Sequence, residues 1–442
     1  MSLRGFDDLI GSIRKRLGAF HDRRMGKNKK YTMGDIALSA FSVFYTQCPS
    51  FLAGQEAMQK SKGRSNAQTL FQIGQIPCAN HIRGTLDEVA PEELYPLYDE
   101  IFESLREQQV LATFQTLGGT TPVALDGTWY FSSENLQCEQ CSTIEHKSGP
   151  ITHYHSAITP VIVAPGHPYA ITLRPEFIVP QDGHDKQDCE IAAAKRWLDK
   201  EAARYVAALN DNVTFLGDDI YAHQPFCRRI LQQRSHFIFT CLPQSHPHLT
   251  QWVSTLESPD LRTVSLRVKD AKGHWEAHTY RYANGVPLVA EESALKVNWC
   301  EVTITGKYRK TPYYNAWITD WKITGENVAD IVATGRCRWK IENENNNTLK
   351  TKGYHLEHNF GHGKKHLSSL LAAMNMLALL THTFLHYCDD AYRLIRATLP
   401  TRKTFFEHIR ALTYYHCFPS WEALMDFMMR GLVIGPYAVQ DA

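Results

Sequence analysis

Two aspartates stand where apolar runs of the sequence stop, which is a common place for chemistry. Asp126 follows Pro122-Val-Ala-Leu, and Asp218 follows Val213-Thr-Phe-Leu-Gly. Both runs predict buried strands, and a sheet holds a strand-end carboxylate rigidly while the neighbouring loops form a cleft around it. Each aspartate taken alone could also be an ordinary turn residue without a chemical role, because Asp is frequent in the turns that follow strands.

A third acid lies in a segment with helical spacing. Glu342 ends the string Arg338-Trp-Lys-Ile-Glu, and the arginine and the glutamate share one face of the predicted helix. An exposed Arg–Glu pair of small energetic weight would explain the same spacing. Glu344 is a second acid of the same helix and an alternative to Glu342.

A second group of residues could hold a structural zinc ion. Cys138-x-x-Cys141 supplies two thiols, and zinc prefers four sulfur or nitrogen ligands in tetrahedral geometry. Cys189 and one histidine, His155 or His153, complete the predicted set. The alternative is that these are reduced, partly buried thiols.

The elements that must position these residues follow from the spacing of apolar side chains. This spacing predicts helices in residues 1–115 and an α/β region in residues 116–365. Its strands are predicted at 122–126, 153–163, 170–179, 213–218 and 236–241, and its helices at 189–209 and 223–233. This order predicts a mixed sheet with helices on its faces.

A β-rich insertion is predicted at about 242–328, before the helix that carries Glu342. Its strands are expected at 263–268, 275–282, 298–305 and 313–323, and the helix at 329–350. Helical spacing then continues through the C-terminal region, 366–442. The most apolar stretch, 367–385, is interrupted by polar residues and predicts a buried helix rather than a membrane span.

Three segments together resemble the signatures of bacterial insertion-sequence DDE transposases. They are Leu125-Asp-Gly-Thr, Leu216-Gly-Asp-Asp-Ile-Tyr and Arg338-Trp-Lys-Ile-Glu, in this order. The match is to the cut-and-paste group with a β-strand insertion before the catalytic Glu, the insertion-sequence-4-like superfamily. The resemblance covers residues 118–365, and the helical regions on either side are compatible with it.

The resemblance implies a ribonuclease-H-like core in which Asp126, Asp218 and Glu342 are catalytic and bind two Mg²⁺ (or Mn²⁺) ions. Mg²⁺ prefers carboxylate oxygen and keeps several waters, so three acids can hold a pair of ions with DNA phosphate completing their coordination. One ion would form the nucleophile from water or a 3′-hydroxyl, and the other would stabilise the leaving oxygen. Arg338 and Lys350 would contact DNA phosphates, and a homodimer would act on the terminal inverted repeats and the target DNA.

The chain departs from the family's third signature at two positions. Gly335 stands where the family has a tyrosine, and Leu349 stands where it has a lysine, with Lys350 one place later. In the second signature, Asp219 is an alternative to Asp218. The histidines of the segment after this helix could suggest a metal site by spacing, but two glycines among them disfavour it; they are His355, His358 and His362.

The net charge alone does not indicate a DNA partner. The chain has 47 Lys and Arg against 46 Asp and Glu, so a DNA contact must come from local basic patches. The N-terminal patch is the candidate for recognising the element's ends, and its basic residues are Arg4, Arg14, Lys15, Arg16, Arg23, Arg24, Lys27, Lys29 and Lys30.

The remaining expectations concern compartment and activity. Eleven cysteines, an odd number in a long chain, do not indicate a secreted disulfide framework, and no signal peptide is recognised, so we expect a cytoplasmic protein. The resemblance to bacterial insertion-sequence transposases implies a bacterial protein that associates with the nucleoid when active. Two alternatives remain open: a nuclease of the same fold that cuts without joining, and an inactive relative that only binds DNA.

Overall fold

The N-terminal region is helical, as the sequence predicts. The computed structural model describes residues 3–25, 29–58, 65–180 and 189–438. Side chains of Thr32, Ser50 and Ser65 accept hydrogen bonds from the first turns that follow them, which fixes where three helices begin. The helices are α1 (Phe6–Gly18), α2 (Met33–Tyr45), α3 (Phe51–Ala57), α4 (Asn66–Phe71), α5 (Ala79–Leu86) and α6 (Tyr95–Glu107), with short 3₁₀ turns at Pro91–Leu94, Leu111–Phe114 and Leu117–Gly119.

The central region alternates strands and helices. Its strands are β1 (Thr121–Ala124), β2 (Gly127–Ser133), β3 (Ser142–Glu145), β4 (Ile151–Ile158), β5 (Val161–Ile162), β6 (Ile171–Thr172), β7 (Glu176–Ile178), β8 (Val213–Gly217) and β9 (His236–Thr240). Its helices are α7 (Glu190–Trp197), which runs through a π-helical turn at Leu198–Ala202 into α8 (Ala203–Ala208), and α9 (Gln224–Gln232), with a 3₁₀ turn at Asp219–Tyr221. Every residue of β8 is buried, as expected of a central parallel strand.

One nine-stranded sheet runs through the molecule in the order β10-β11-β12-β13-β9-β8-β1-β5-β6. β1, β8 and β9 are parallel, whereas β5 is antiparallel to both β1 and β6. The half β6-β5-β1-β8-β9 has the order and directions of a ribonuclease-H-like core, with α9 and α11 packed on β9 and α13 on β6. The predicted fold class is confirmed.

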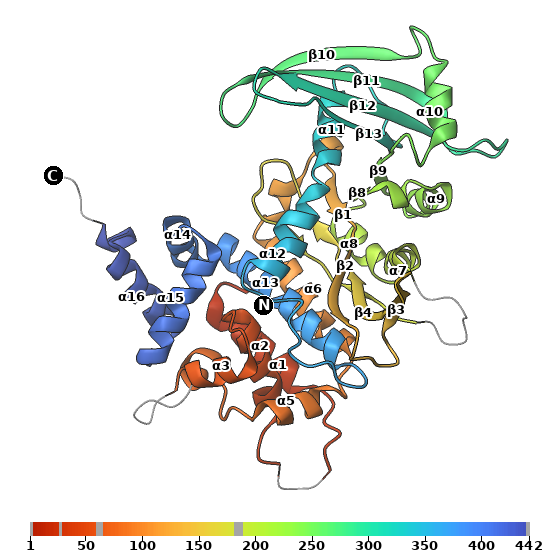
Figure 1. The fold of residues 1–442 in the computed structure, drawn as a ribbon. Helices are drawn as coiled ribbons and strands as arrows, with labels where there is room; N and C mark the ends of the chain where they lie inside the picture. The colour runs from red at the N-terminus through yellow and green to blue at the C-terminus, as the bar shows by residue number, and fades with distance from the viewer. Residues whose placement is uncertain (1–2, 26–28, 59–64, 181–188, 439–442) are drawn as a thin grey trace.

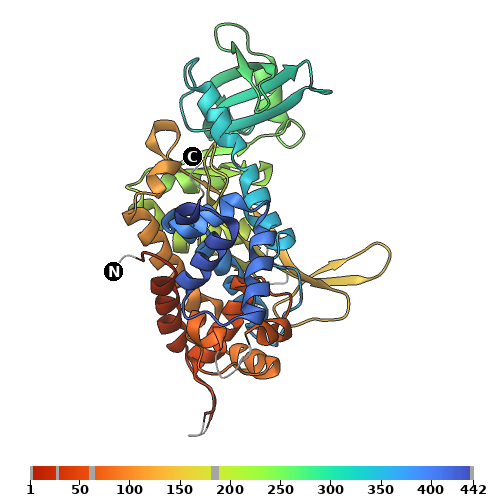
Figure 2. The ribbon, with the colours of Figure 1, turned by 90° about the vertical axis from the view of Figure 1, so that its left-hand side faces the viewer.

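A second, smaller sheet was not predicted in full. β2 pairs with β4, and β4 pairs in turn with β3 and β7. No strand is predicted from the sequence between residues 126 and 153, and β2 and β3 lie in this interval, each paired with β4. The turn between β3 and β4 projects from the body of the molecule, in gold at the right of Figure 2.

The β-rich insertion continues the core sheet instead of forming a separate layer. It consists of α10 (Pro247–Ser254), β10 (Arg262–Lys269), β11 (Trp275–Pro287), β12 (Lys296–Gly306) and β13 (Tyr313–Thr319). β13 pairs antiparallel with β9, with Trp317 opposite Thr240. In Figures 1 and 2 the insertion strands lie at one end of the molecule and the helical regions at the other.

The C-terminal part is helical and is built around one long buried helix. The elements are α11 (Val328–Arg336), a π-helical segment (Ile341–Asn346), α12 (Asn347–Thr351), α13 (Leu367–Cys388), α14 (Asp390–Thr398), α15 (Arg402–Tyr415), α16 (Trp421–Leu432) and a 3₁₀ turn at Gly435–Tyr437. By length and composition α13 could cross a membrane, yet 94% of its most apolar window is buried inside the protein.

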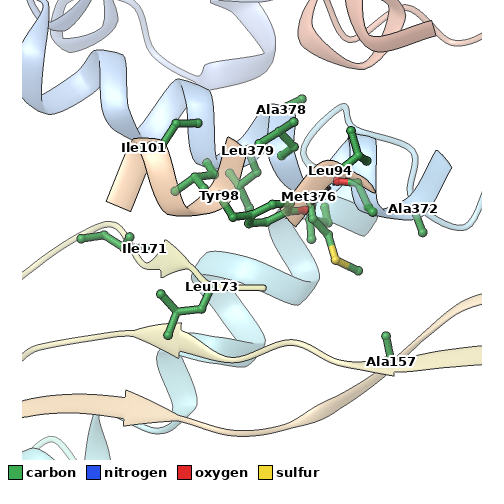
Figure 3. Close-up of a cluster of buried hydrophobic side chains, with 14 of the residues drawn as sticks. Leu94, Tyr98, Ile101, Ala157, Ile171, Leu173, Ala372, Met376, Ala378 and Leu379 are labelled. Atoms are coloured by element: carbon green, nitrogen blue, oxygen red, sulfur yellow. Dashed lines mark hydrogen bonds between the residues drawn. The ribbon is translucent and has the colours of Figure 1, made fainter. Parts of the chain in front are cut away.

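α13 joins the helical N-terminal region to the sheet. It packs against α2, α6 and β6, and the Tyr98 hydroxyl of α6 donates a hydrogen bond to the Ala373 carbonyl at 2.7 Å. Figure 3 shows side chains of α6 and α13, among them Tyr98 and Met376, gathered above strand residues such as Ile171. The core therefore runs without interruption from the first helices to the edge of the sheet.

Candidate active site

The first two predicted acids lie side by side at one edge of the sheet. β1 and β8 are parallel neighbours in which Ala124 is opposite Leu216, so Asp126 and Asp218 each follow the last paired residue by two positions. Carboxyl ends of parallel strands form the usual site of chemistry in such sheets. Asp218 also accepts a hydrogen bond from the Ile220 N–H at 3.0 Å, which fixes its side chain at the start of a 3₁₀ turn.

The third predicted acid reaches this edge from the helical segment that follows α11. Glu342 is exposed over 47% of its side chain, and its Oε1 lies 2.6 Å from an Arg338 guanidinium nitrogen. The Arg338 charge lowers the pKa of both Asp126 and Asp218, whereas the Glu342 charge raises both. Arg338 and Glu342 therefore lie close enough to the two aspartates for their charges to interact.

Burial and mutual repulsion act together on the acids. Burial is the largest cause that raises the pKa of Asp126 to about 7, and the charge of Glu190 is the next. Burial also raises the pKa of Asp218. A site that crowds carboxylates in this way gains stability from any cation that neutralises them.

Glu190, at the first position of α7, is a further acid of this site that was not predicted from the sequence. Its Oε1 accepts hydrogen bonds from the Gly127 N–H at 3.1 Å and from the Tyr221 hydroxyl at 2.8 Å. Because Gly127 follows Asp126 and Tyr221 closely follows Asp218, one carboxylate links the two turns that carry the acids. An acid opening a helix carries no spacing signal that could have singled it out.

Glycine at position 127 leaves room for this contact. A Cβ there would lie 2.5 Å from Glu190 Oε2, so a larger residue would force the Glu190 carboxylate to shift. The Gly127 position thus lets the Glu190 carboxylate approach the backbone next to Asp126.

The three asparagines after Glu344 belong partly to the core. Asn345 and Asn346 are 0% and 6% exposed, and they accept hydrogen bonds from the hydroxyls of Thr172 and Thr159, each at 2.9 Å. The segment is π-helical, a form that often marks functional sites. The buried amides therefore bind β6 and the turn between β4 and β5, and of the three asparagines only Asn347 is exposed.

The departure of the third signature at Gly335 has a steric reason. A Cβ at Gly335 would lie 2.8 Å from Trp317 Nε1 and 2.9 Å from Ile238 Cγ2. α11 therefore approaches β13 and β9 more closely than a tyrosine at this position would permit. The second departure, Leu349, is fully buried in the core.

The alternative acids have other surroundings. Asp219 Oδ1 accepts a hydrogen bond from the Leu242 N–H at 2.7 Å and lies 3.3 Å from His246 Nε2, so this carboxylate holds the segment after β9. Glu344 is half-buried on the helix of Glu342. Glu342 is the acid of this helix whose charge raises the pKa of Asp126 and Asp218.

The predicted phosphate-binding residues lie in different settings. Arg338 is within the acid cluster, whereas Lys350 forms an ion pair with Glu357 at 2.9 Å. Beside Asp218 and Arg338 the surface is hollowed into a cavity of about 620 Å³ that Tyr314 and Trp339 also line. Both aromatic side chains are nearly half exposed, at 46% and 47%.

Part of the basic N-terminal patch is used inside the molecule. Arg24 and Lys29 both bind Asp22 at 2.9 Å, and Arg23 binds Glu88 at 3.0 Å. Lys15 and Arg16 line a cavity of about 690 Å³ beside α1. Lys27 lies outside the described residues.

The sulfur and nitrogen ligands predicted for zinc come together only in part. Cys138, Cys141 and His155 converge, but the fourth member of the cluster is His362, from the loop between α12 and α13. Cys189 is exposed at the start of α7 and is not a member. From the sequence, His362 could be grouped only with His355 and His358, because the distance along the chain hides its contact with the cysteines.

Comparison with known proteins gives a remote likeness among solved structures. No protein-family description and no curated protein matches the sequence. Among solved structures, the chain is similar to one described as a cryo-EM structure of the piggyBac transposase synaptic complex with hairpin DNA. The identity is 10% and the TM-score 0.40, over 98% of this chain and 83% of that one.

Proposed function

We propose that this protein is a DDE transposase that cuts and joins DNA strands by metal-dependent phosphoryl transfer, and so moves an insertion sequence. The observation that carries the proposal is the convergence of Asp126, Asp218 and the Arg338–Glu342 pair from three distant parts of the chain. The motifs around these residues resemble those of insertion-sequence transposases in the same order.

The chemistry of these side chains suits a hard divalent cation. Three carboxylates supply only oxygen, which Mg²⁺ and Mn²⁺ prefer, and burial with mutual repulsion holds the pKa of Asp126 at about 7 without a cation. We assign Asp126, Asp218 and Glu342 as the metal ligands. Two bound ions would activate the attacking oxygen and stabilise the leaving one.

The residues of the chain itself prepare this site for DNA. Glu190 and Asn346 fix the turn and the side chain of Asp126, and Asp218 is fixed by its own 3₁₀ turn. Arg338 supplies a positive charge beside the acids, where a phosphate would enter, and Lys350 supplies a second one further along the same helical segment. Exposed Tyr314 and Trp339 offer ring faces on which a base can stack.

The partners follow from this activity. The substrate is DNA: the terminal inverted repeats of the element and a target. Two ends must be processed together, so we infer a homodimer on DNA, acting at the bacterial nucleoid. The basic residues of α1 and of the segment after it, within residues 1–115, are the proposed contact with the element's ends.

The test is cleavage of labelled DNA that carries the element's own ends, with Mg²⁺ or Mn²⁺. Asp126→Asn, Asp218→Asn and Glu342→Gln should each abolish cleavage and joining while a gel-shift assay still detects DNA binding. Glu344→Gln, on the same helix as Glu342, is the matched control and should remain active.

Each of the contrary results has a definite meaning. Activity of Glu342→Gln together with loss of activity in Glu344→Gln would move the third ligand to Glu344. Cleavage without joining would indicate a nuclease. Binding without cleavage for the wild type, with either ion, would indicate a DNA-binding relative that has lost catalysis.

A further inference from the structure

Four side chains from three separate segments meet in a cluster outside the acidic site. Cys138 and Cys141 lie between β2 and β3, His155 lies on β4, and His362 lies in the loop between α12 and α13. All four potential ligand atoms are within 4.8 Å of one another. Cys141 and His155 are 7% and 2% exposed.

The separations between these atoms are those that a tetrahedral zinc ion imposes. With Zn–S of ~2.3 Å and Zn–N of ~2.0 Å, tetrahedral angles place S···S at ~3.8 Å, S···N at ~3.5 Å and N···N at ~3.3 Å. The two Sγ atoms are 3.8 Å apart, and His155 Nε2 is 3.5 Å from each of them. His362 Nε2 is 3.5 Å from Cys141 Sγ and 3.1 Å from His155 Nε2.

Neither a disulfide nor a nucleophilic thiol fits the cluster as well as a metal ion does. A disulfide needs an S–S length near 2.05 Å, and the sulfurs are 3.8 Å apart. A nucleophilic cysteine needs one base and an open approach, whereas here two thiols and two imidazoles point at a single centre. Two thiols and two imidazoles make a closed set of four ligands, typical of structural rather than catalytic zinc.

We propose that Cys138, Cys141, His155 and His362 bind one structural zinc ion. The ion would join the β2–β4 sheet, whose first strand begins directly after Asp126, to the loop that follows the helix of Glu342. His362 already packs on Phe131 of β2, with ring centroids 4.5 Å apart.

The loop that carries His362 is also bound to the N-terminal helices. Asp87 accepts hydrogen bonds from the N–H groups of Lys365 and Leu367, each at 3.0 Å, and Arg83 donates one to the Phe360 carbonyl at 2.6 Å. With zinc bound, this loop would fasten three parts of the molecule to one another: the small sheet, the catalytic helix segment and the N-terminal region.

The experiment is a measurement of zinc in the full-length protein by plasma mass spectrometry. We expect about one zinc per chain in the wild type and close to none in Cys141→Ser and His362→Ala. The matched controls are Cys189→Ser and His358→Ala, an exposed cysteine and an exposed histidine outside the cluster, which should keep a full complement.

A second measurement guards against variants that fail to fold. Wild-type protein loaded with Co²⁺ instead of zinc should show the visible bands of a tetrahedral thiolate site, and His362→Ala should lose them. Adding a zinc chelator should lower the wild-type unfolding temperature and leave that of His362→Ala unchanged. The proposal would be overturned if the wild type contained no zinc after growth and dialysis in the presence of zinc. It would also be overturned if His362→Ala still bound one zinc per chain. Neither measurement involves DNA cleavage, so the result is independent of the proposed transposase activity.

Discussion

The Asn346 amide donates a hydrogen bond to Asp126 Oδ2 across 3.4 Å, from the helical segment that also carries Glu342. The same amide group accepts from Thr159 and from Asn345 through its oxygen, so its orientation is fixed on both sides. One buried side chain thus links the first acid of the site to the segment that supplies the third.

Asn346→Ala should therefore weaken metal binding at the acidic site. Positioning groups behind a metal ligand commonly contribute ~10–100-fold to metal affinity, and we expect a loss in this range. Titration with Mn²⁺ followed by electron paramagnetic resonance measures it. Asn347→Ala, at the exposed neighbour, is the control and should bind Mn²⁺ as the wild type does; equal affinities for the two variants would remove the positioning role from Asn346.

The raised pKa of Asp126 predicts how stability depends on pH when no divalent ion is added. The folded-state pKa is about 7, above the unfolded value of ~4. Between these values the folded protein holds a proton that the unfolded chain releases, so stability falls as pH rises through this window. Asp126→Asn removes the titration. Its unfolding temperature should exceed that of the wild type by a few degrees at pH 8 but not at pH 4; a constant difference across pH would contradict the assignment.

Glu190→Gln should move the pH dependence of metal binding to lower pH. The substitution removes the charge that most strongly raises the pKa of Asp126, while an amide oxygen can still accept from Gly127 and Tyr221. Asp126 would then lose its proton, and bind Mn²⁺, at a more acidic pH. Glu190→Ala removes the hydrogen bonds as well and should lower affinity at every pH, by ~10-fold or more. A purely structural role for Glu190 would leave the midpoint of the Glu190→Gln profile unchanged.

Arg338→Gln should shift the same profile in the opposite direction. The guanidinium lowers the pKa of Asp126, Asp218 and Glu190, so its removal makes the acids harder to ionise. Mn²⁺ binding should then require a higher pH, and DNA cleavage should fall ~10-fold or more from loss of a charged phosphate contact. Lys350→Gln, whose lysine pairs with Glu357, should leave the pH midpoint in place.

Much of the sheet was predictable because its strands carry local signals. β8 and β9 are short apolar runs ended by turn residues. The four strands of the insertion are rich in residue types that favour strands. β2 and β3 were not predicted, because their residues are mixed in polarity and their order comes from pairing with β4. That the insertion extends the core sheet through β13 and β9 also depends on a long-range pairing with no sequence signature.

The candidate site divides in the same way. Asp126, Asp218 and Glu342 could be selected because each stands at a fixed place in a recognisable segment. Glu190 and His362 could not, because each acquires its partners only when distant segments pack together. Gly335 is understood only once α11 lies against Trp317.

The burial of α2 bears on how such a protein can change over evolutionary time. Every residue of α2 is buried, and the helix packs against α1, α5 and α13, so the first hundred residues share one core with the last hundred. A region built in this way cannot be exchanged between relatives as a cassette, because the recipient would have to match its packing. If the N-terminal helices do recognise the DNA ends of the element, a new DNA specificity must come from substitutions of exposed side chains. Each lineage could then change the DNA sequence that it recognises only by a few base pairs at a time.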